Sequence, residues 1–520
     1  MIANIAHKYL DFKFREVDRF ISKPIHTQEK ILACLLQNGS DTLIGRQYNF
    51  STIGNKDGYR KRVPVFHYED LRPYLDKILI DKQQNVLWNK PVRWFAMSSG
   101  TTEDKSKYIP VTYESLTKSH YKCGEQMLAI YGQANHKARF FFGKTLVLGG
   151  SKQINNIGDG IFTGDISAIL IKNLYFWAKR SRTPESISLV PDWEVKLQAL
   201  TDYAVKNDIR AFMGVPSWLL VLLKKIKADT GREPADIWPN LEVFFHGGVS
   251  FTPFEEQYKK IIQKPDMYYW ETYNASEGFF GVQFSNDSKD MLLMLDNGVY
   301  YEFVPMSEWN SQNPKTLTLN EVETGQNYAL LISTNGGLWR YMIGDTIEFT
   351  STCPYLFRIT GRTKNFINAF GEELIIDNAE KALAAACKAA NALISEYTAA
   401  PVYFGDDNTG AHEWLVEFFV EPDDPERFAR LLDENLKKVN SDYEAKRSHD
   451  LSLGLPIVRS VPKGTFNEWL RSIGKLGGQN KVPRLSNNRD YMDKLLMFIK
   501  QNGTGCTLQQ TCRLRIQKPI

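Results

Sequence analysis

The sequence predicts an α/β protein with three parts: a large N-terminal domain on mostly parallel sheets, an appended small β-barrel or antiparallel sheet, and a smaller α+β C-terminal domain. Up to about residue 275, buried-strand candidates alternate with helical stretches, the pattern of a parallel sheet covered by helices. From Met291 to about Phe349, short β segments follow one another, which predicts antiparallel pairing. Beyond about residue 365 the helical and strand patterns restart, which predicts a separate domain.

Length and composition are those of an ordinary globular protein. A chain of 520 residues is too long for one hydrophobic core, so we expect domains over 1–361 and 362–500, with a polar tail over 501–520. The net charge of +4 is too mild to indicate a nucleic-acid partner. The longest apolar run, near 218–223, is too short to cross a membrane.

The first residues and the cysteines indicate a cytoplasmic protein. The N-terminus lacks the apolar core of a signal peptide. Six cysteines form no CxxC pair, which favours free thiols in a reducing compartment over disulfides or a zinc site. We expect no membrane partner, and a monomer or a weak oligomer.

Helices are expected over most of residues 1–90. An apolar stripe with helical spacing over 31–36 stops near Gly39, which is typical of a helix end. The stretch 62–71 is predicted to be extended and to lead into another helix. The apolar run 94–97 then leads into a polar loop over 97–110.

Three buried strands are predicted before residue 280, over 144–150, 241–248 and 267–273. Helices over about 190–206 and from Pro216 separate them, with Pro216 at a first helical position, where its missing N–H costs nothing. Because ligands of a parallel sheet bind at the carboxyl ends of its strands, we expect functional residues there.

The last third of the chain predicts helices alternating with a strand. One helix begins near Asp377, and 412–419 alternates as a strand. A second helix is expected to begin with Asp424 as N-cap and Pro425 at its first position.

The polar loop over 97–110 has the composition of a phosphate site. Small residues and hydroxyls leave backbone N–H groups free to converge on an anion, and two lysines follow. The residues concerned are Ser98, Ser99, Gly100, Thr101, Thr102, Lys105 and Lys107. The alternative interpretation is a polar surface turn.

Three later stretches complete a recognisable set with this loop. They are 273–278 (Tyr-Asn-Ala-Ser-Glu-Gly), 338–345 (Leu-Trp-Arg-Tyr-Met-Ile-Gly-Asp) and 477–484 (Gly-Gly-Gln-Asn-Lys-Val-Pro-Arg). In order and spacing the set resembles adenylate-forming enzymes and, more narrowly, the GH3 acyl acid amido synthetases, which include plant auxin- and jasmonate-conjugating enzymes and bacterial members. The resemblance covers about residues 25–495.

The resemblance implies an ATP- and Mg²⁺-dependent ligase. Such an enzyme adenylates a small carboxylic acid with release of pyrophosphate, and then transfers the acyl group to an amino acid or another amine with release of AMP. An acyl-CoA ligase, which uses the same first step, and a catalytically silent nucleotide-binding protein are the alternatives.

The resemblance also implies how the nucleotide is held. The hydroxyls of residues 98–102 would donate to the ATP phosphates, with Gly100 admitting the backbone. Gly247 and Gly248 would give adenine access to the backbone. In the stretch that contains Asn274 and Ser276, Tyr273 would stack on or wall the base, with a core tyrosine as the alternative. Asp345 would accept from both ribose hydroxyls, with a turn aspartate as the alternative.

Four further residues are implied in catalysis and hinge motion. Glu277 would hold Mg²⁺, because this hard cation prefers carboxylate oxygen; an exposed loop acid is the alternative. Arg362 and Lys364 match the family's hinge. Lys481 would neutralise charge at the reacting phosphate, with a solvated surface lysine as the alternative. The phosphate loop departs from the family at Thr102-Glu103-Asp104 and at Ser106. Acids beside a triphosphate are unfavourable unless they point away or reach the metal.

Overall fold

The computed structural model falls into two compact units, which are described separately. They are Met1–Thr363 with Gly477–Asn480, and Lys364–Leu476 with Lys481–Ile520. The structure describes residues 2–98, 107–149, 154–248, 251–252, 254–309, 311, 313–362, 366–367, 369, 372, 374–402, 410–440, 443–444, 447, 453–475 and 482–501.

The first unit begins with the predicted helices. They are α1 (Ile2–Ser22), α2 (Pro24–Gly39), α3 (Leu43–Gln47), α4 (Lys56–Arg62) and α5 (Tyr68–Leu79), with a 3-10 turn, η1, at Phe50–Thr52. The end of α2 at Gly39 is confirmed. A side chain at Gly39 would place its Cβ 2.6 Å from the ring of Trp339, so the glycine lets the helix end pack against the central sheet.

A ten-stranded sheet forms the centre of the first unit, in the order β11-β12-β13-β14-β10-β9-β8-β7-β6-β3. The strands are β3 (Lys144–Leu148), β6 (Ile209–Gly214), β7 (Val243–Gly247), β8 (Tyr268–Ala275), β9 (Gly278–Gln283), β10 (Met291–Leu293), β11 (Val299–Pro305), β12 (Asn327–Thr334), β13 (Tyr341–Thr352) and β14 (Tyr355–Arg362). Strands β3, β6, β7 and β8 are parallel, and all pairs from β8 to β11 are antiparallel. The predicted antiparallel segment therefore extends the parallel sheet.

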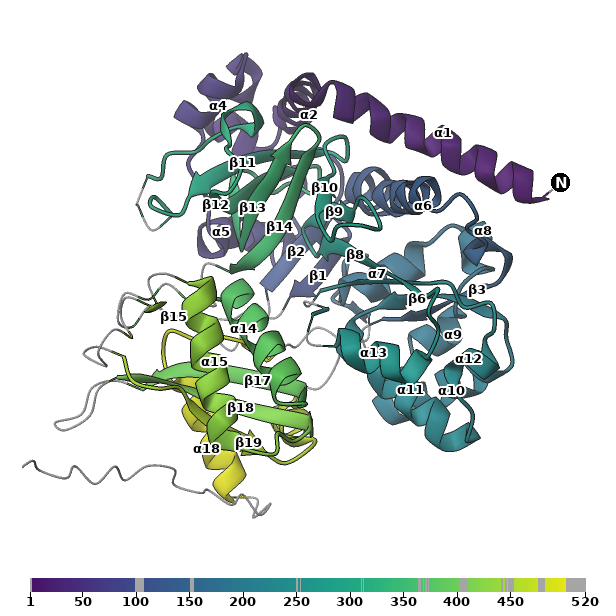
Figure 1. Cartoon of the computed structure of the whole chain (residues 1–520). Coiled ribbons are helices and arrows are strands. Elements are labelled where there is room, and N and C mark those ends of the chain that lie inside the picture. The colour runs from purple at the N-terminus through teal and green to yellow at the C-terminus, as the bar shows by residue number, and fades with distance from the viewer. Residues whose placement is uncertain are drawn as a thin grey trace, which may run out of the picture. The chain divides into compact units, whose positions relative to one another are not determined.

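Helices cover both faces of the parallel strands. Successive residues of β6 and β7 alternate between two buried clusters: Ala211 and Val243 belong to the larger one, and Phe212 and Phe244 to the smaller. Figure 1 shows α10 to α13 gathered below these strands and α6 above. The helices are α6 (Lys122–Ala134), α7 (Ile166–Asn173), α8 (Phe176–Lys179), α9 (Glu185–Ser188), α10 (Trp193–Val205), α11 (Pro216–Thr230), α12 (Pro234–Ile237) and α13 (Glu255–Ile262), with the π-helix η2 (Ser115–Tyr121) and the short 3-10 turns η3 (Phe140–Phe142) and η4 (Leu319–Glu321). The helix that begins at Pro216 is confirmed.

Several strands were not predicted, among them β6 and β2. Strand β6 ends two residues before the start of α11, and the stretch before Pro216 was assigned no element. In a second, four-stranded sheet of order β2-β1-β5-β4, strand β2 (Lys107–Val111) pairs antiparallel with β1 (Trp94–Ser98). The other two strands are β5 (Phe162–Gly164) and β4 (Asn155–Asn156). The predicted loop over 97–110 is therefore wrong at its end, because Ile109 and Val111 are buried strand residues.

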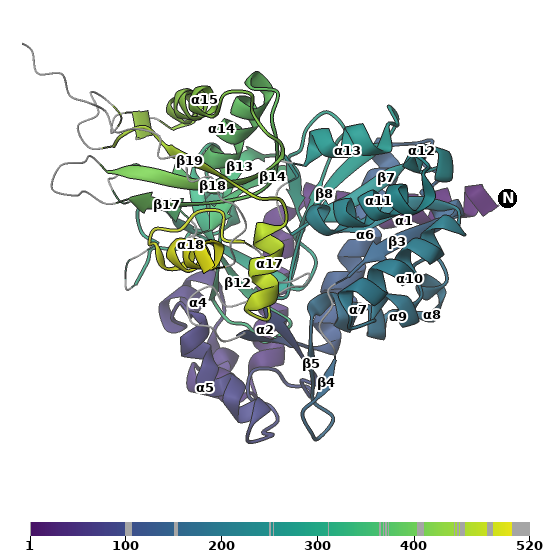
Figure 2. The same cartoon turned by 90° about the horizontal axis from the view of Figure 1, so that it is seen from below.

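The second unit is the predicted α+β fold. Its elements are β15 (Phe366–Ile367), β16 (Leu374–Ile375), α14 (Ile376–Ala389), β17 (Leu393–Val402), β18 (Ala411–Val420), α15 (Pro425–Val439), β19 (Ile457–Val461), α17 (Thr465–Ser472) and α18 (Asp490–Gln501). Figure 2 shows α14 and α15 on one side of the β17-β18-β19 sheet and α18 on the other. The Asp424 cap is confirmed, since Oδ1 accepts from Arg427 N at 2.9 Å. Among the described helices of the chain, none is long and apolar enough to cross a membrane.

Candidate nucleotide site

Tyr273 and Asp345, which lie 72 positions apart, are joined by a hydrogen bond. The Tyr273 hydroxyl donates to Asp345 Oδ2 at 2.5 Å, and both residues are 6% exposed. Tyr273 comes from β8 and Asp345 from β13, with three strands between them in the sheet order. A tyrosine side chain cannot reach across three strands of a flat sheet, so the sheet curves here and brings β8 and β13 together.

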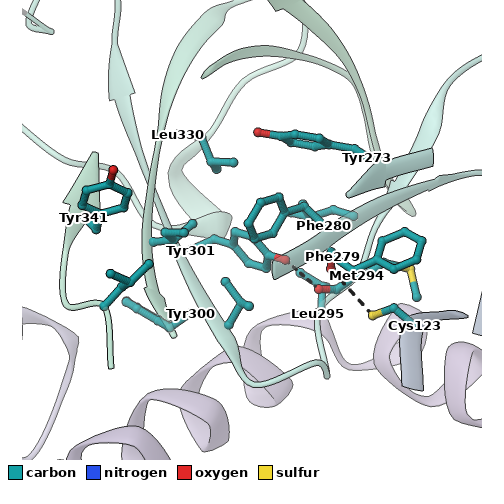
Figure 3. Packing of buried hydrophobic residues seen from close by; sticks show 14 of the residues in the cluster. Cys123, Tyr273, Phe279, Phe280, Met294, Leu295, Tyr300, Tyr301, Leu330 and Tyr341 are labelled. Atoms are coloured by element: carbon teal, nitrogen blue, oxygen red, sulfur yellow. Dashed lines mark hydrogen bonds between the residues drawn. The ribbon is translucent and has the colours of Figure 1, made fainter. Parts of the chain in front are cut away.

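Neighbouring aromatic rings hold Tyr273 in this position. Its ring contacts Phe280 edge-on at 5.0 Å and Phe357 at 6.2 Å between centroids. Its cross-strand partner is Gly281, where a Cβ would lie 2.6 Å from the Phe357 ring. In Figure 3 the Tyr273 ring lies next to Phe280, in the buried cluster that also contains Tyr301.

The end of β8 and the turn after it carry the other predicted residues of this motif. Asn274, in β8, is exposed; in the turn, Ser276 is buried and Glu277 is half-buried. A Cβ at Gly278 would come within 2.8 Å of the Phe280 ring, so only glycine lets the turn close here.

The π-helix η2 packs against this turn and brings two residues that sequence reasoning missed. Ser119 Oγ accepts from the backbone N–H of Phe279 at 3.4 Å, and His120 Nδ1 lies 3.1 Å from Asn274 Oδ1. A π-helix is rare and is frequent at functional sites, but its residues carry no pattern that distinguishes it from an α-helix.

His120 is a neutral acceptor at physiological pH. Its burial lowers the pKa of the imidazole to about 4. Because an amide oxygen can only accept, the contact with Asn274 places the proton on Nδ1. This leaves Nε2 as a buried acceptor with no partner among the described residues.

Gly247 and Gly248 lie at the carboxyl end of β7, next to β8. A Cβ at Gly247 would lie 2.4 Å from the carbonyl oxygen of Thr272, so no other residue fits between the two strand ends. Gly248 has a φ of +84°, a conformation that favours glycine. Both positions are at the edge where a parallel sheet binds ligands.

The motif 338–345 serves the fold as well as the site. The buried Arg340 donates to both oxygens of Glu302 at 2.9 Å, and Trp339 Nε1 donates to the carbonyl of Leu87 at 3.1 Å. These contacts fix the start of β13, while Asp345, further along the strand, lies opposite Arg362 of β14.

The structure brings together part of the predicted set. Tyr273 and Asp345 meet directly, Asn274 near the end of β8 precedes the turn that holds Ser276 and Glu277, and the backbone of Arg362 pairs with Asp345. Ser98 ends β1, and its side chain is not described. The remaining predicted residues, Ser99, Gly100, Thr101, Thr102, Lys364 and Lys481, lie outside the described residues.

The turn after β8 offers a candidate ligand for Mg²⁺ in the carboxylate of Glu277. Among the described residues no group of three or more His, Cys, Asp or Glu side chains could hold a metal ion. Mg²⁺ in nucleotide sites is often bound through one or two carboxylates, with phosphate and water completing the shell. The half-buried carboxylate of Glu277 fits that limited contribution.

The chain is similar to known proteins over most of its length. It is 24% identical to the indole-3-acetic acid-amido synthetase GH3.3 of Arabidopsis thaliana, over 94% of this chain and 93% of the relative. It is 24% identical to the jasmonoyl--L-amino acid synthetase JAR4 of Nicotiana attenuata, over 88% and 90%.

Solved structures share the fold. The acyl acid amido synthetase GH3.15 in complex with 2,4-DB matches with a TM-score of 0.76 at 17% identity, over 94% of this chain and 96% of that one. A 2-hydroxyisobutyryl-CoA ligase matches with a TM-score of 0.58 at 12% identity, over 91% of each chain.

Models of the three GH3 domains match successive parts of the sequence. The N-terminal domain model matches residues 13–267, the central domain model 292–362 and the C-terminal domain model 377–490. These matches span most of the 520 residues, and the chain therefore belongs to the GH3 family.

Proposed function

We propose that the protein is an ATP-dependent acyl acid amido synthetase. A carboxylate oxygen of the acid attacks the α-phosphorus of ATP, the bond to the bridging oxygen of pyrophosphate breaks, and an acyl-adenylate forms. An amine then attacks the acyl carbon, loses a proton and displaces AMP. No covalent enzyme intermediate is needed, so the protein contributes positioning and charge neutralisation.

The contact between Tyr273 and Asp345 carries this proposal. A buried carboxylate held by a tyrosine hydroxyl is oriented to accept hydrogen bonds from the two ribose hydroxyls, and the tyrosine ring offers a wall for adenine. The glycines that end β7 give the base access to the backbone beside this wall. The hydroxyls of residues 98–102 would hold the phosphates.

Mg²⁺ would be held by Glu277 together with ATP phosphates. Bound there, it would neutralise phosphate charge. Lys481 would act at the same phosphates from the domain over 362–500, and Arg362 and Lys364 would serve as the hinge between this domain and the domain over 1–361.

The substrates of the relatives suggest the class of acid. The relatives are named for indole-3-acetic acid and jasmonoyl conjugation, and a related structure binds 2,4-DB. We therefore propose a small carboxylic acid with an apolar body, and an amino acid as acceptor, in a cytoplasmic setting.

A pyrophosphate-release screen tests the proposal. Indole-3-acetate, jasmonate and 2,4-DB are each offered with ATP and Mg²⁺, with an amino-acid pool or with coenzyme A. We expect release with at least one acid and AMP formation that depends on the amino acids. Dependence on coenzyme A would identify an acyl-CoA ligase, and no release with any acid would favour a silent nucleotide-binding protein.

A further inference from the structure

Arg182 is a part-buried arginine without an acidic partner in the described protein. The side-chain contact of its guanidinium is Nη1 to the thioether sulfur of Met213, at 3.8 Å. A thioether is a weak acceptor and carries no charge. The titratable group that acts on the guanidinium among the described residues is the hydroxyl of Tyr121, and burial lowers the pKa of Arg182.

Three described arginines that are more deeply buried than Arg182 each pair with a carboxylate. Arg340 pairs with Glu302, Arg447 with Asp433 and Arg484 with Glu396. Burial of an arginine without such a partner is unfavourable, because desolvation of its charge is then uncompensated. The part-buried Arg182 therefore has donors that a ligand anion could satisfy.

The backbone of Arg182 is fixed beside the sheet. The segment runs parallel to β3, with Thr145 N donating to Ser181 O at 2.7 Å and Thr183 N donating to Thr145 O at 3.1 Å. The Tyr203 hydroxyl donates to the Arg182 carbonyl at 3.4 Å. An anchored backbone limits the loss of conformational entropy when the guanidinium binds a ligand.

The guanidinium lies at the edge of the sheet where ligands bind. Met213 is the residue before Gly214, which ends β6, and it packs against the larger core cluster, on the side of Tyr121 and Tyr273. Tyr121 follows His120 on η2, and His120 contacts Asn274 of the candidate nucleotide site. One π-helix therefore contacts both the turn after β8 and the surroundings of Arg182.

We propose that Arg182 binds the carboxylate of a substrate. This inference rests on the proposed function, which supplies two sources of carboxylate, the acyl acid and the acceptor amino acid. A planar guanidinium donates two parallel hydrogen bonds to a carboxylate, which gives orientation as well as affinity. His120, which precedes Tyr121 on η2, has a buried acceptor without a partner among the described residues, and this favours the amino acid, whose amine can donate where a simple acid cannot.

Substitution of Arg182 by glutamine tests the proposal, with Arg210→Gln as the matched control. Arg210 is a part-buried arginine near the opposite end of β6 and pairs with Asp208 at 2.8 Å. In one arm, the KM of the acid is measured in ATP–pyrophosphate exchange without amine. In the other, the KM values of L-alanine and of L-alaninamide, which lacks the carboxylate, are measured through AMP release.

Loss of a charge-assisted hydrogen bond is expected to raise the relevant KM about 10- to 100-fold in Arg182→Gln. If the amino acid is bound, the KM of L-alanine rises while that of L-alaninamide and the exchange reaction stay within about twofold. If the acid is bound, its KM in exchange rises. Arg182→Lys is expected to restore part of the loss, and Arg210→Gln to change neither KM.

The melting temperature of Arg182→Gln distinguishes a role of Arg182 in substrate binding from a purely structural role. Because an unpaired charge is removed, free Arg182→Gln is expected to unfold at the same temperature as wild type or higher. A lower melting temperature with unchanged KM values in both arms would overturn the proposal.

If the wild type shows no exchange with any acid, the proposed function fails. The thermal shift produced by 2,4-DB and by L-alanine in wild type and Arg182→Gln then tests Arg182 separately: a shift lost in the variant supports it, and equal or absent shifts contradict it.

Discussion

The hydroxyl of Tyr273 donates a 2.5 Å hydrogen bond to Asp345 in the buried face of the central sheet. Asp345 also lies opposite Arg362, the last residue of β14. The residue expected beside adenine and the residue expected beside ribose are thus mechanically joined before any nucleotide binds. A preformed contact of this kind lowers the conformational cost of binding.

Asp345→Ala is expected to weaken ATP binding more than it harms folding. A lost charge-assisted contact to ribose costs roughly 1.5–3 kcal/mol, about a 10- to 150-fold rise in the Kd of ATP by calorimetry. The control is Asp290→Ala, which removes an ion pair to Arg358 of β14 without touching Tyr273. Normal ATP affinity together with early melting would make Asp345 a structural residue.

Glu277→Gln is expected to reduce the stabilisation of the protein by ATP and Mg²⁺. At about 100 times the Kd, a ligand stabilises the native state by roughly 2.7 kcal/mol. Wild type is expected to show this shift in thermal unfolding, whereas the variant shows it only at higher Mg²⁺ concentration. If the variant responds to Mg²⁺ as the wild type does, Glu277 is an ordinary loop acid.

The neutral His120 predicts acid sensitivity of the fold. Its folded pKa, about 4, lies below the unfolded value of 6.5, so at intermediate pH the unfolded chain binds the extra proton. The free energy of unfolding contributed by this group is therefore lost as pH falls from 6.5 towards 4, by up to about 3 kcal/mol.

Urea unfolding between pH 4 and 7 checks this expectation. His120→Gln is expected to reduce the pH dependence in that window, of which the buried His246, whose pKa burial lowers to about 3, contributes another part, while His136→Gln, at an exposed position, is expected to leave it unchanged. A wild-type slope retained in His120→Gln would show that His120 does not stay neutral by burial.

Lys481→Ala is expected to separate the two half-reactions. Charge develops on the phosphates during adenylation, and loss of one stabilising group there commonly costs about 10²–10³ in rate. Aminolysis of a synthetic acyl-adenylate, which has already lost pyrophosphate, is expected to stay within about tenfold of wild type.

The control is Lys463→Ala in the same unit, whose ammonium lies 5.2 Å from the ring of Phe419. It is expected to leave both half-reactions unchanged. Equal losses in both half-reactions of Lys481→Ala would indicate a folding defect, and no loss would make Lys481 a solvated surface lysine.

Sequence patterns predicted the features that depend on neighbours along the chain. The cap at Asp424, the helix start at Pro216 and the helix end at Gly39 each follow from local backbone chemistry. The three predicted buried strands are present. They could be predicted because glycines and small polar residues mark their ends. Adjacent local signals were harder to separate, so β6 was missed before the helix start at Pro216 and β2 was merged with the loop before it.

The contacts that assemble the site depend on distant residues. The approach of Tyr273 to Asp345 follows from the strand order and from the curvature of the sheet, neither of which has a local pattern. The π-helix that carries His120 likewise has no sequence pattern that distinguishes it from an α-helix. Trp339 and Arg340 belong to a recognisable motif, but only their buried partners reveal a structural role.

The central claim is that the acid is activated as an acyl-adenylate, and transfer of ¹⁸O from a labelled carboxylate measures this directly. The enzyme is incubated with the ¹⁸O-labelled acid that gives the strongest pyrophosphate release, together with ATP, Mg²⁺ and L-alanine, and the products are analysed by mass spectrometry. Adenylation predicts one ¹⁸O atom in the phosphate of AMP and an amide that retains the other. Amide formation with ADP and ¹⁸O-labelled inorganic phosphate, or AMP without label, would contradict it.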